Sequence, residues 1–306
     1  MALRLYRTTQ WLYGQVTATL QVLHVPAAVG HNPTLFGLVA LYVTGLVLLD
    51  ARPSQTRISQ VLPARQHDAL NRLLRTVPLS TRALLAGPLH LVAGLSRTLG
   101  TRGYLVVDDV VIEKPFAKRL PWAAWTYSFA QKRKVYGCHI VLLSWTSEPT
   151  GRWRIPVAFR LWRPKRSCAP GRYQKKTELV VTMLCELVAA GCPAAYLVGD
   201  TAYTGGCVSK AAGRLGLVWV GTLSPRTTVV YRGKRQAVRD LAGRLKLKWR
   251  SQLGVRAVAL RVYAPALGQV RLVVLKNEHG NFEYLVTNAL ATDLTTLVRS
   301  ACRFPR

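Results

Sequence analysis

The chain has 306 residues and a mass of 33.9 kDa, enough to bury a full hydrophobic core in about one to three domains. Hydrophobic residues make up 50% of it and charged residues 18%, which argues against intrinsic disorder. The 43 Lys and Arg against 13 Asp and Glu give a formal net charge of +30, which favours a polyanionic partner, nucleic acid first and an anionic membrane surface second. The six cysteines have neither C-x-x-C spacing nor a histidine at zinc-ligand spacing, so neither a disulfide framework nor a zinc site is predicted.

The first hundred residues predict a small all-helical domain, because apolar residues recur there at intervals of three and four. The apolar run over residues 34–49 has 16 residues, fewer than the roughly 20 needed to cross a bilayer, so we expect a buried helix and no membrane span. The N-terminus also lacks the charged start, apolar centre and small-residue cleavage site of a signal peptide. These features favour a cytoplasmic protein.

A second helix is expected over residues 53–62, separated from the apolar helix by a short turn. This order is typical of a helix-turn-helix, in which the second helix enters the major groove of DNA. Helical hairpins are also common in proteins that bind no DNA. Residues 1–100 are therefore interpreted as a helical domain with a DNA-binding role as one of two alternatives.

From Gly103 the sequence changes to strand-forming residues. Three strands, over residues 104–108, 135–145 and 152–161, predict an antiparallel meander. Helices over 174–190 and 206–215 then alternate with strands over 195–200 and 217–221. Residues 222–281 contain short alternating runs that predict a β-rich insertion, and a last strand over 282–287 precedes a helical start at Asp293.

Two of the hydrophobic runs end in aspartate, YLVVDD at 104–109 and AYLVGDTAY at 195–203, in a chain with few acids. Such runs are typical of buried strands, and the active sites of open α/β sheets lie at the carboxyl ends of their strands. Asp108 and Asp200 would suit a site for two divalent ions, since carboxylate oxygens are the ligands that Mg²⁺ prefers. The alternative is that both are turn or cap residues, as most aspartates at strand ends are.

The sequence resembles the DDE transposases of bacterial insertion sequences, a ribonuclease H-like group with a β-strand insertion between the second Asp and the last Glu. The resemblance covers roughly residues 103–296 and rests on YLVVDDVVIEKP, VYGCHIVLLSW, RLWRPKR, YLVGDTAYTG and YLVTN. Asp200 and Tyr203 keep the family's Asp-x-x-Tyr spacing. The resemblance implies an α/β fold over residues 101–306, with a ribonuclease H-like mixed sheet flanked by helices and a β-rich insertion at about 222–281, after the N-terminal all-helical domain.

The resemblance also implies that Asp108 is the first catalytic acid and Asp200 the second, and that both bind Mg²⁺ or Mn²⁺. Asp109 stays open as the alternative first ligand, because adjacent residues of a strand face opposite sides. Tyr203 is expected to pack beside the site or to stack on a flipped base, with a place in the core as the alternative. The basic residues expected to line a DNA channel, unless they are ordinary solvated surface, are Lys114, Lys118, Arg119, Lys132, Arg133 and Lys134.

The sequence departs from the family at its last motif, a helix that carries a Tyr, an Arg, a Glu and a Lys after the final strand. Here no Glu follows Glu283 and no Tyr follows Tyr284. Glu278 and Glu283 lie in the last hairpin and are poor replacements. We therefore expect that the third catalytic acid and the final catalytic helix are missing.

The activity implied for a complete relative is metal-dependent strand cleavage and strand transfer at the ends of the element. The expected partners are double-stranded DNA, at element ends and target sites, and a second copy of the chain in a homodimer. The expected location is the cytoplasm, on the nucleoid. The first alternative is a DNA-binding remnant of a transposase without activity, and the second is a basic membrane-surface protein.

Overall fold

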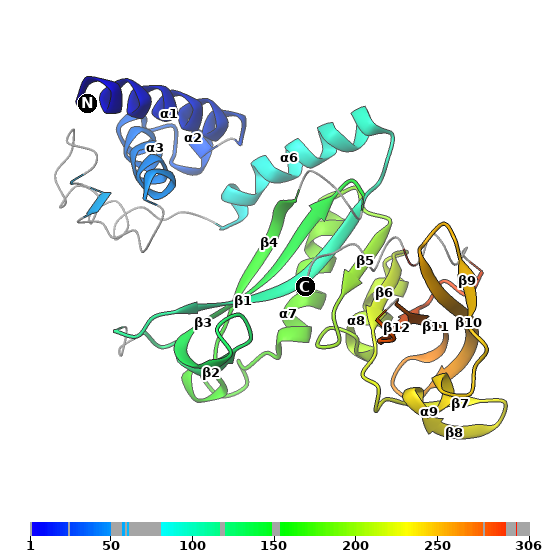
Figure 1. Ribbon diagram of the computed structural model, residues 1–306. Helices are drawn as coiled ribbons and strands as arrows, with labels where there is room; N and C mark the ends of the chain where they lie inside the picture. The colour runs from blue at the N-terminus through cyan, green and yellow to red at the C-terminus, as the bar shows by residue number, and fades with distance from the viewer. Residues whose placement is uncertain are drawn as a thin grey trace. The chain divides into compact units, whose positions relative to one another are not determined.

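The structure is a computed structural model that describes residues 2–23, 25–49, 57, 58, 60, 81–116, 120–148, 154–277, 279–291 and 298. The chain divides into two compact units, Met1–Gly94 and Leu95–Arg306. Each unit is described by itself (Figure 1).

The described residues of the first unit are mainly helical. Its described helices are α1 (Ala2–Val22), α2 (Val25–Ala28), α3 (Pro33–Leu48) and α6 (Thr81–Leu99), the last of which continues past Gly94. Asn32 caps α3 by accepting hydrogen bonds from the backbone N–H groups of Thr34 and Leu35, and Pro33 fits the first helical position because its missing N–H is not needed there.

The prediction of a buried helix over residues 34–49 is wrong in part. Helix α3 buries one stripe, formed by Ala40, Thr44 and Gly45, whereas Val47 is 60% exposed. No helix among the described residues is long and apolar enough to cross a membrane. The helix predicted over 53–62 lies outside the described residues except for residues 57, 58 and 60. Of these, Ile58 is fully buried and packs against the side chains of α3.

The second unit begins with the predicted alternation of strands and helices. Its first elements are β1 (Tyr104–Glu113), β2 (Ala124–Ser128), β3 (Arg133–Thr146), β4 (Ile155–Trp162), a short 3₁₀ helix (Lys165–Ser167), α7 (Lys176–Ala189), β5 (Tyr196–Gly199), α8 (Gly206–Arg214) and β6 (Val218–Thr222). The strands lie in the order β4-β3-β1-β5-β6, with antiparallel pairs up to β1 and parallel pairs from β1 to β6. This mixed α/β arrangement is consistent with a ribonuclease H-like fold.

Two details of this region differ from the prediction. Strand β1 does not end at Asp108 but continues to Glu113, because β3 pairs with it along its whole length. Strand β2 was not predicted, because its five residues lie between two turns and show too short a pattern.

The predicted β-rich insertion consists of β7 (Thr228–Tyr231), β8 (Lys234–Ala237), α9 (Val238–Ala242), β9 (Lys248–Arg250), β10 (Val255–Ala264) and β11 (Gly268–Lys276). The last predicted strand is confirmed as β12 (Phe282–Thr287), which lies between β6 and β11 and is antiparallel to both. The insertion therefore continues the central sheet. The helical start predicted at Asp293 lies outside the described residues.

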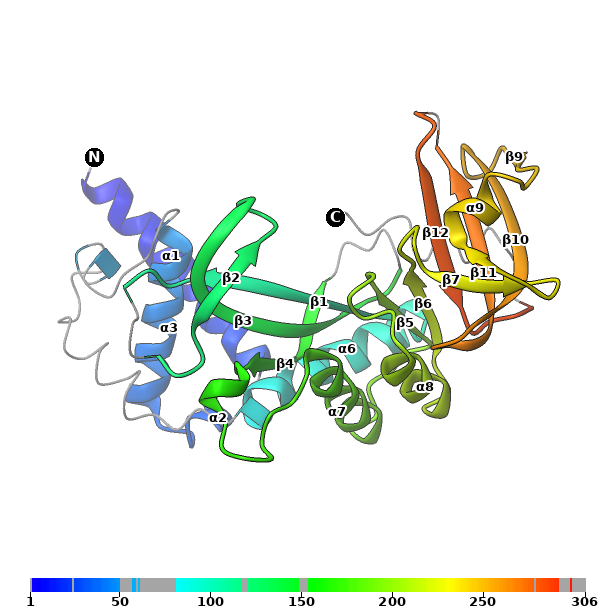
Figure 2. The ribbon, with the colours of Figure 1, turned by 90° about the horizontal axis from the view of Figure 1, so that it is seen from below.

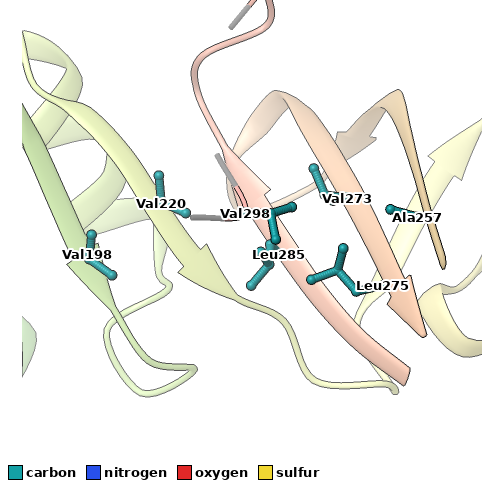
Figure 3. Packing of buried hydrophobic residues seen from close by; sticks show 7 residues of the cluster. All are labelled: Val198, Val220, Ala257, Val273, Leu275, Leu285 and Val298. Atoms are coloured by element: carbon teal, nitrogen blue, oxygen red, sulfur yellow. The ribbon is translucent and has the colours of Figure 1, made fainter. Parts of the chain in front are cut away.

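A hydrophobic cluster holds the insertion to the central strands (Figure 3). Val198 of β5 and Val220 of β6 belong to it together with Leu285 of β12 and Val273 of β11. Val298, near the C-terminus, is 4% exposed and belongs to the same cluster.

Helices α7 and α8 contact each other and lie against one face of the central strands, α7 against β3 and β4 and α8 against β6 (Figure 2). The two faces of β1 are consequently different. Leu105 and Val107 are buried on the helix-covered face, whereas Val106 and Asp108 point to the opposite face, with Asp108 exposed. The face opposite the helices is therefore exposed at Asp108, whereas at Tyr104 it packs against the hydrophobic cluster that contains Val198 and Val220.

Candidate metal and DNA site

The two predicted acids directly follow the point where the parallel pairing of β1 with β5 stops. Val107 of β1 is paired with Gly199 of β5, and Asp108 and Asp200 are the next residue on each strand. Glycine is required at 199, because a Cβ atom there would lie 2.8 Å from Cγ1 of Val107 and 3.2 Å from Cβ of Tyr203. The close approach of the two strands keeps Asp108 and Asp200 next to each other.

Each of these two carboxylates is held by a backbone N–H group. Oδ1 of Asp108 accepts a hydrogen bond of 2.8 Å from the N–H of Asp109, and Oδ1 of Asp200 accepts one of 2.9 Å from the N–H of Ala202. The turn after β5 is tightened further because the Thr204 hydroxyl donates to the backbone carbonyl of Asp200 at 2.8 Å. Both side chains are exposed, and neither forms an ion pair with a described residue.

The pKa of Asp108 is raised above its ordinary value. The largest cause is partial burial against the sheet, which the hydrogen bond from the N–H of Asp109 opposes. The negative charges of Asp200 and Asp109 raise the pKa further. Asp108 therefore lies close enough to Asp200 for the two carboxylates to repel each other, and a bound cation would relieve that repulsion.

The pair Asp108 and Asp200 fits a hard divalent ion such as Mg²⁺ or Mn²⁺ in ligand type and charge. Within the described ranges, no group of three or more His, Cys, Asp or Glu side chains lies together as a metal site. Glu283 lies on β12, separated from β5 by β6, and Glu278 lies outside the described residues. The described part of the chain therefore places no third acid in a group with Asp108 and Asp200.

Asp109, the alternative first ligand, lies on the other face of β1 in a buried polar cluster. Its Oδ2 accepts a hydrogen bond of 2.5 Å from Nζ of Lys176, at the start of α7, and its Oδ1 accepts one of 3.0 Å from the hydroxyl of Tyr203. Burial alone would raise the pKa of Asp109, but the hydrogen bonds from Lys176 and Tyr203 and the positive charge of Lys176 outweigh burial and hold that pKa well below its usual value.

His139 completes this cluster. Its Nδ1 lies 2.8 Å from Nζ of Lys176, and its Nε2 lies 2.8 Å from the hydroxyl of Thr126. Because the ammonium group can only donate, Nδ1 accepts and Nε2 carries the proton. Nδ1 then cannot donate to Asp109, 3.4 Å away, so Lys176 is the main partner of that carboxylate.

Tyr203 does not lie where a DNA base could reach it. Its side chain is fully buried, and burial together with the charge of Asp109 raises the pKa of its hydroxyl. Stacking of Tyr203 on a flipped base is therefore corrected to the alternative that the sequence left open, a place in the core beside the site.

The predicted basic residues differ in their surroundings. Lys114 and Lys134 are exposed, and Lys132 is exposed in a turn at φ 52°. Arg133 donates two hydrogen bonds to Glu113, of 2.8 and 3.0 Å, so part of its charge is neutralised by a neighbouring strand. Lys118 and Arg119 lie outside the described residues.

An open pocket of about 390 Å³ lies beside the turn that follows Asp200. Thr201 and Thr204 of that turn line it together with Thr222, Thr227 and Arg235 of the following segment. Hydroxyl groups and a guanidinium are donors suited to phosphate oxygens. Neither Asp108 nor Asp200 lines this pocket, and the hydroxyl of Thr204 already donates to the carbonyl of Asp200, so the pocket is separate from the carboxylate pair.

The sequence did not single out Lys176 or Thr126 as part of a site. Their partners, Asp109 on β1 and His139 on β3, are distant from them in the sequence, so no local spacing relates them. The sequence indicates nothing about His139 beyond its position next to Cys138. Its charged partners Asp109 and Lys176 are 30 and 37 residues away in the sequence.

The pattern of acids and strands agrees with a match to a known protein family. The family of the DDE superfamily endonucleases matches residues 31–248, which is more than half of the chain. The chain belongs to the DDE superfamily endonucleases. Members of this family typically use a divalent metal ion, which agrees with the ligand type of Asp108 and Asp200.

The DDE endonuclease chain was also compared with individual proteins. No curated protein sequence matched it. Among solved structures it is similar to a piggyBac transposase synaptic complex with hairpin DNA, with 12% identity and a TM-score of 0.43 over 94% of this chain and 63% of that one. It is also similar to the NurA nuclease from Sulfolobus solfataricus, with 9% identity and a TM-score of 0.34 over 63% of this chain and 70% of that one. We infer nothing about function from similarities this low.

Proposed function

We propose that this DDE endonuclease is an insertion-sequence transposase, which binds element-end DNA and carries out metal-dependent strand cleavage and strand transfer. The observation that supports this most is the pairing of β1 with β5, because Asp108 and Asp200 are the next residues after that parallel pairing stops and both are exposed. A site of this kind at the carboxyl ends of parallel strands is the expected place for chemistry in an open α/β sheet.

In this proposal Asp108 and Asp200 hold the ion, and Asp109 does not. Asp109 instead holds β1 to α7 through Lys176, and to the turn after β5 through Tyr203. A divalent ion bound at the pair would polarise the scissile phosphodiester and lower the pKa of a bound water. Lys114, Lys132 and Lys134 are proposed to contact the phosphates of the DNA.

The second candidate is a DNA-binding remnant that does not cleave. The observation that favours it is that the described residues offer two carboxylates and no third metal ligand beside them. Loss of one group that stabilises the transition state commonly lowers a rate by about 10²–10³, so in this case DNA binding would persist without measurable cleavage.

A strand-nicking assay on element-end DNA with Mn²⁺ tests the proposal. The variants are Asp108→Asn and Asp200→Asn, with Asp240→Asn as the matched control, because Asp240 is an exposed acid on α9. Nicking that is lost in the first two variants and kept in the control supports the transposase. DNA binding without nicking supports the remnant, and nicking that survives both substitutions contradicts the assignment of the two ligands.

A further inference from the structure

Three large aromatic side chains of the second unit project into solvent. Trp125 is 70% exposed, Tyr127 46% and Phe129 86%. Side chains of this size are normally buried, because each carries a large apolar area. Apolar patches that stay exposed on a folded protein commonly mark a binding surface.

These rings share one face of the ribbon formed by β2 and β3. Trp125 and Tyr127 are two residues apart on β2 and point to the same side, and the register places Tyr136 opposite Trp125 and Lys134 opposite Tyr127. We call the set Trp125, Tyr127, Phe129, Lys134 and Tyr136 the aromatic ribbon face. In Figure 2 this ribbon extends away from the strands β5 and β6.

The rings are arranged edge to face. Trp125 and Tyr136 have ring centroids 5.7 Å apart with an angle of 63° between their planes, and Tyr127 and Phe129 have centroids 5.1 Å apart at 79°. In such a pair one ring presents only its edge to the other. Ring faces are therefore left available to a further flat ring.

The aromatic ribbon face is on the same side of the sheet as Asp108. Cys138 of β3 lies opposite Ile112 of β1, and Tyr136 is two residues before Cys138, so all three point to one side. On β1 that side continues through Ile112 and Val110, both exposed, to Asp108. One exposed apolar path thus connects the rings with the carboxylate pair.

The charges along this path favour an anion. Lys134 belongs to the face itself, and the exposed Lys114, the residue after the end of β1, donates its backbone N–H to the carbonyl of Tyr136. Glu113 points to the other side and is paired with Arg133, so the only carboxylate that β1, β2 and β3 carry on this side is Asp108. Flat apolar rings next to lysines match the bases and phosphates of a nucleic acid strand.

We propose that the aromatic ribbon face binds an unpaired DNA strand by base stacking and leads it to Asp108 and Asp200. Unpaired bases fit this surface better than a duplex, because the bases of a duplex are already stacked on each other and their faces are not accessible. The binding of an unpaired strand stands on the geometry of the face alone. Its delivery to the carboxylates rests on the proposed function.

Binding of fluorescent oligothymidine and of a blunt duplex of the same length tests the first part, without metal. Replacement of Trp125 or Tyr127 by Ala should weaken binding of the single strand about 5- to 150-fold, the effect of losing one stacked base, and leave binding of the duplex unchanged. Trp125→Phe keeps a ring and should retain most of the affinity. The matched control is Trp249→Ala, because Trp249 is also 60% exposed and lies between Lys248 and Arg250 on β9.

Two results would overturn this part. One is an equal loss of affinity for single strand and duplex, or no loss. The other is a change from dimer to monomer in sedimentation of the Trp125→Ala chain without a specific loss for single strands, which would make the face a contact between two copies. A thermal melt unchanged from that of the unmodified chain confirms that the exposed positions tolerate substitution.

The second part is tested by nicking of element-end DNA that carries a few unpaired nucleotides at the cleavage position. The unmodified chain should nick this substrate faster than the fully paired one, and Trp125→Ala should remove the difference between the two substrates. A difference that persists in Trp125→Ala would refute the delivery. Asp108→Asn should keep the Trp125-dependent binding of single strands, so a failure of the proposed function is distinguished from a failure of this inference.

Discussion

The hydroxyl of Tyr203 donates a hydrogen bond of 3.0 Å to Oδ1 of Asp109. Each of these residues is close in sequence to one of the two exposed acids, Asp109 next to Asp108 and Tyr203 in the turn that begins at Asp200. The bond therefore fixes the turn after β5 to β1 from the buried side of the sheet. The distance between the carboxylates of Asp108 and Asp200 therefore depends on the hydrogen bond between Tyr203 and Asp109 on the other face of the sheet.

Tyr203→Phe should lower the free energy of unfolding by about 1.5–3 kcal/mol, the usual contribution of a hydrogen bond to a charged group. The ring still fills its place in the core, so the loss reports the hydroxyl alone. Urea denaturation measures it. Tyr263→Phe is the control, because Tyr263 is 49% exposed and its hydroxyl removal should change stability by less than about 0.5 kcal/mol. Equal stability of all three proteins would contradict a role for this hydrogen bond.

Lys176→Met should lower the free energy of unfolding at neutral pH by about 1–3 kcal/mol, because it leaves the half-buried carboxylate of Asp109 with a weaker set of partners. The folded-state pKa of Asp109 lies below its unfolded value, so its stabilising effect is present above about pH 3.8 and is lost as the pH falls below that. The difference in the free energy of unfolding between Lys176→Met and the unmodified chain should therefore become smaller at acid pH. Unfolding measured from neutral to acid pH checks this, and a difference that does not change with pH would contradict it.

Asp108→Asn should make the metal-free protein at neutral pH as stable as the unmodified chain or more stable. The folded-state pKa of Asp108 is raised, so its ionised form costs stability above the unfolded pKa, and Asn removes that cost. With Mn²⁺ at about 100 times its dissociation constant, the unmodified chain should gain about 2.7 kcal/mol, and the variant should gain little. Calorimetry with and without Mn²⁺ measures both effects. A variant that is less stable without metal would show that Asp108 has a structural role.

Binding of duplex DNA should weaken steeply with salt. With six to ten phosphate contacts, the slope of log affinity against log salt is expected at about −5 to −9. Lys114→Ala should reduce this slope by about 0.9, whereas Arg133→Ala should reduce it by less, because Glu113 already neutralises part of its charge. Titrations at several salt concentrations measure the slopes. Equal effects of the two substitutions would show that Arg133 leaves Glu113 when DNA binds.

Cys192 should react slowly with maleimide in the folded protein. Burial raises the pKa of its thiol to about 12, so the thiol stays protonated at neutral pH, whereas Cys185 and Cys207 are exposed. Mass spectrometry after timed labelling should find the two exposed cysteines modified first. Rapid labelling of Cys192 would mean that α7 and β5 separate often in solution.

The sequence predicted strands best where the pattern was long or bounded by clear turns. Residues 282–287 were predicted as a strand and form β12, and the helix over 174–190 forms α7 with small shifts at its ends. The end of β1 was misplaced, since the exposed residues after Asp108 look like a loop until their pairing with β3 is known. Strand β2 was not predicted, because it is short and its large aromatic residues, Trp125 and Tyr127, are exposed rather than buried in a core.

The candidate site was predictable only in its outline. The hydrophobic runs pointed to Asp108 and Asp200, because a strand end is a local feature. The choice between Asp108 and Asp109 needed the face of β1 on which each lies, and that depends on α7, which supplies Lys176 from a distant part of the chain. The burial of Tyr203 could not be predicted for the same reason. Its partner Asp109 is on β1, which is distant in the sequence from the turn that holds Tyr203.

The position of β12 between β6 and β11 has a consequence for synthesis of the protein. Strand β6 leaves the ribosome before β12, and its outer edge stays unpaired until Phe282–Thr287 has been translated. At about 5–20 residues per second, the intervening residues 223–281 take about 3 to 12 seconds. During that time the nascent chain presents an open strand edge of the kind that other nascent chains can pair with. Chaperone dependence and the yield of active protein should therefore respond to how fast this one stretch is translated.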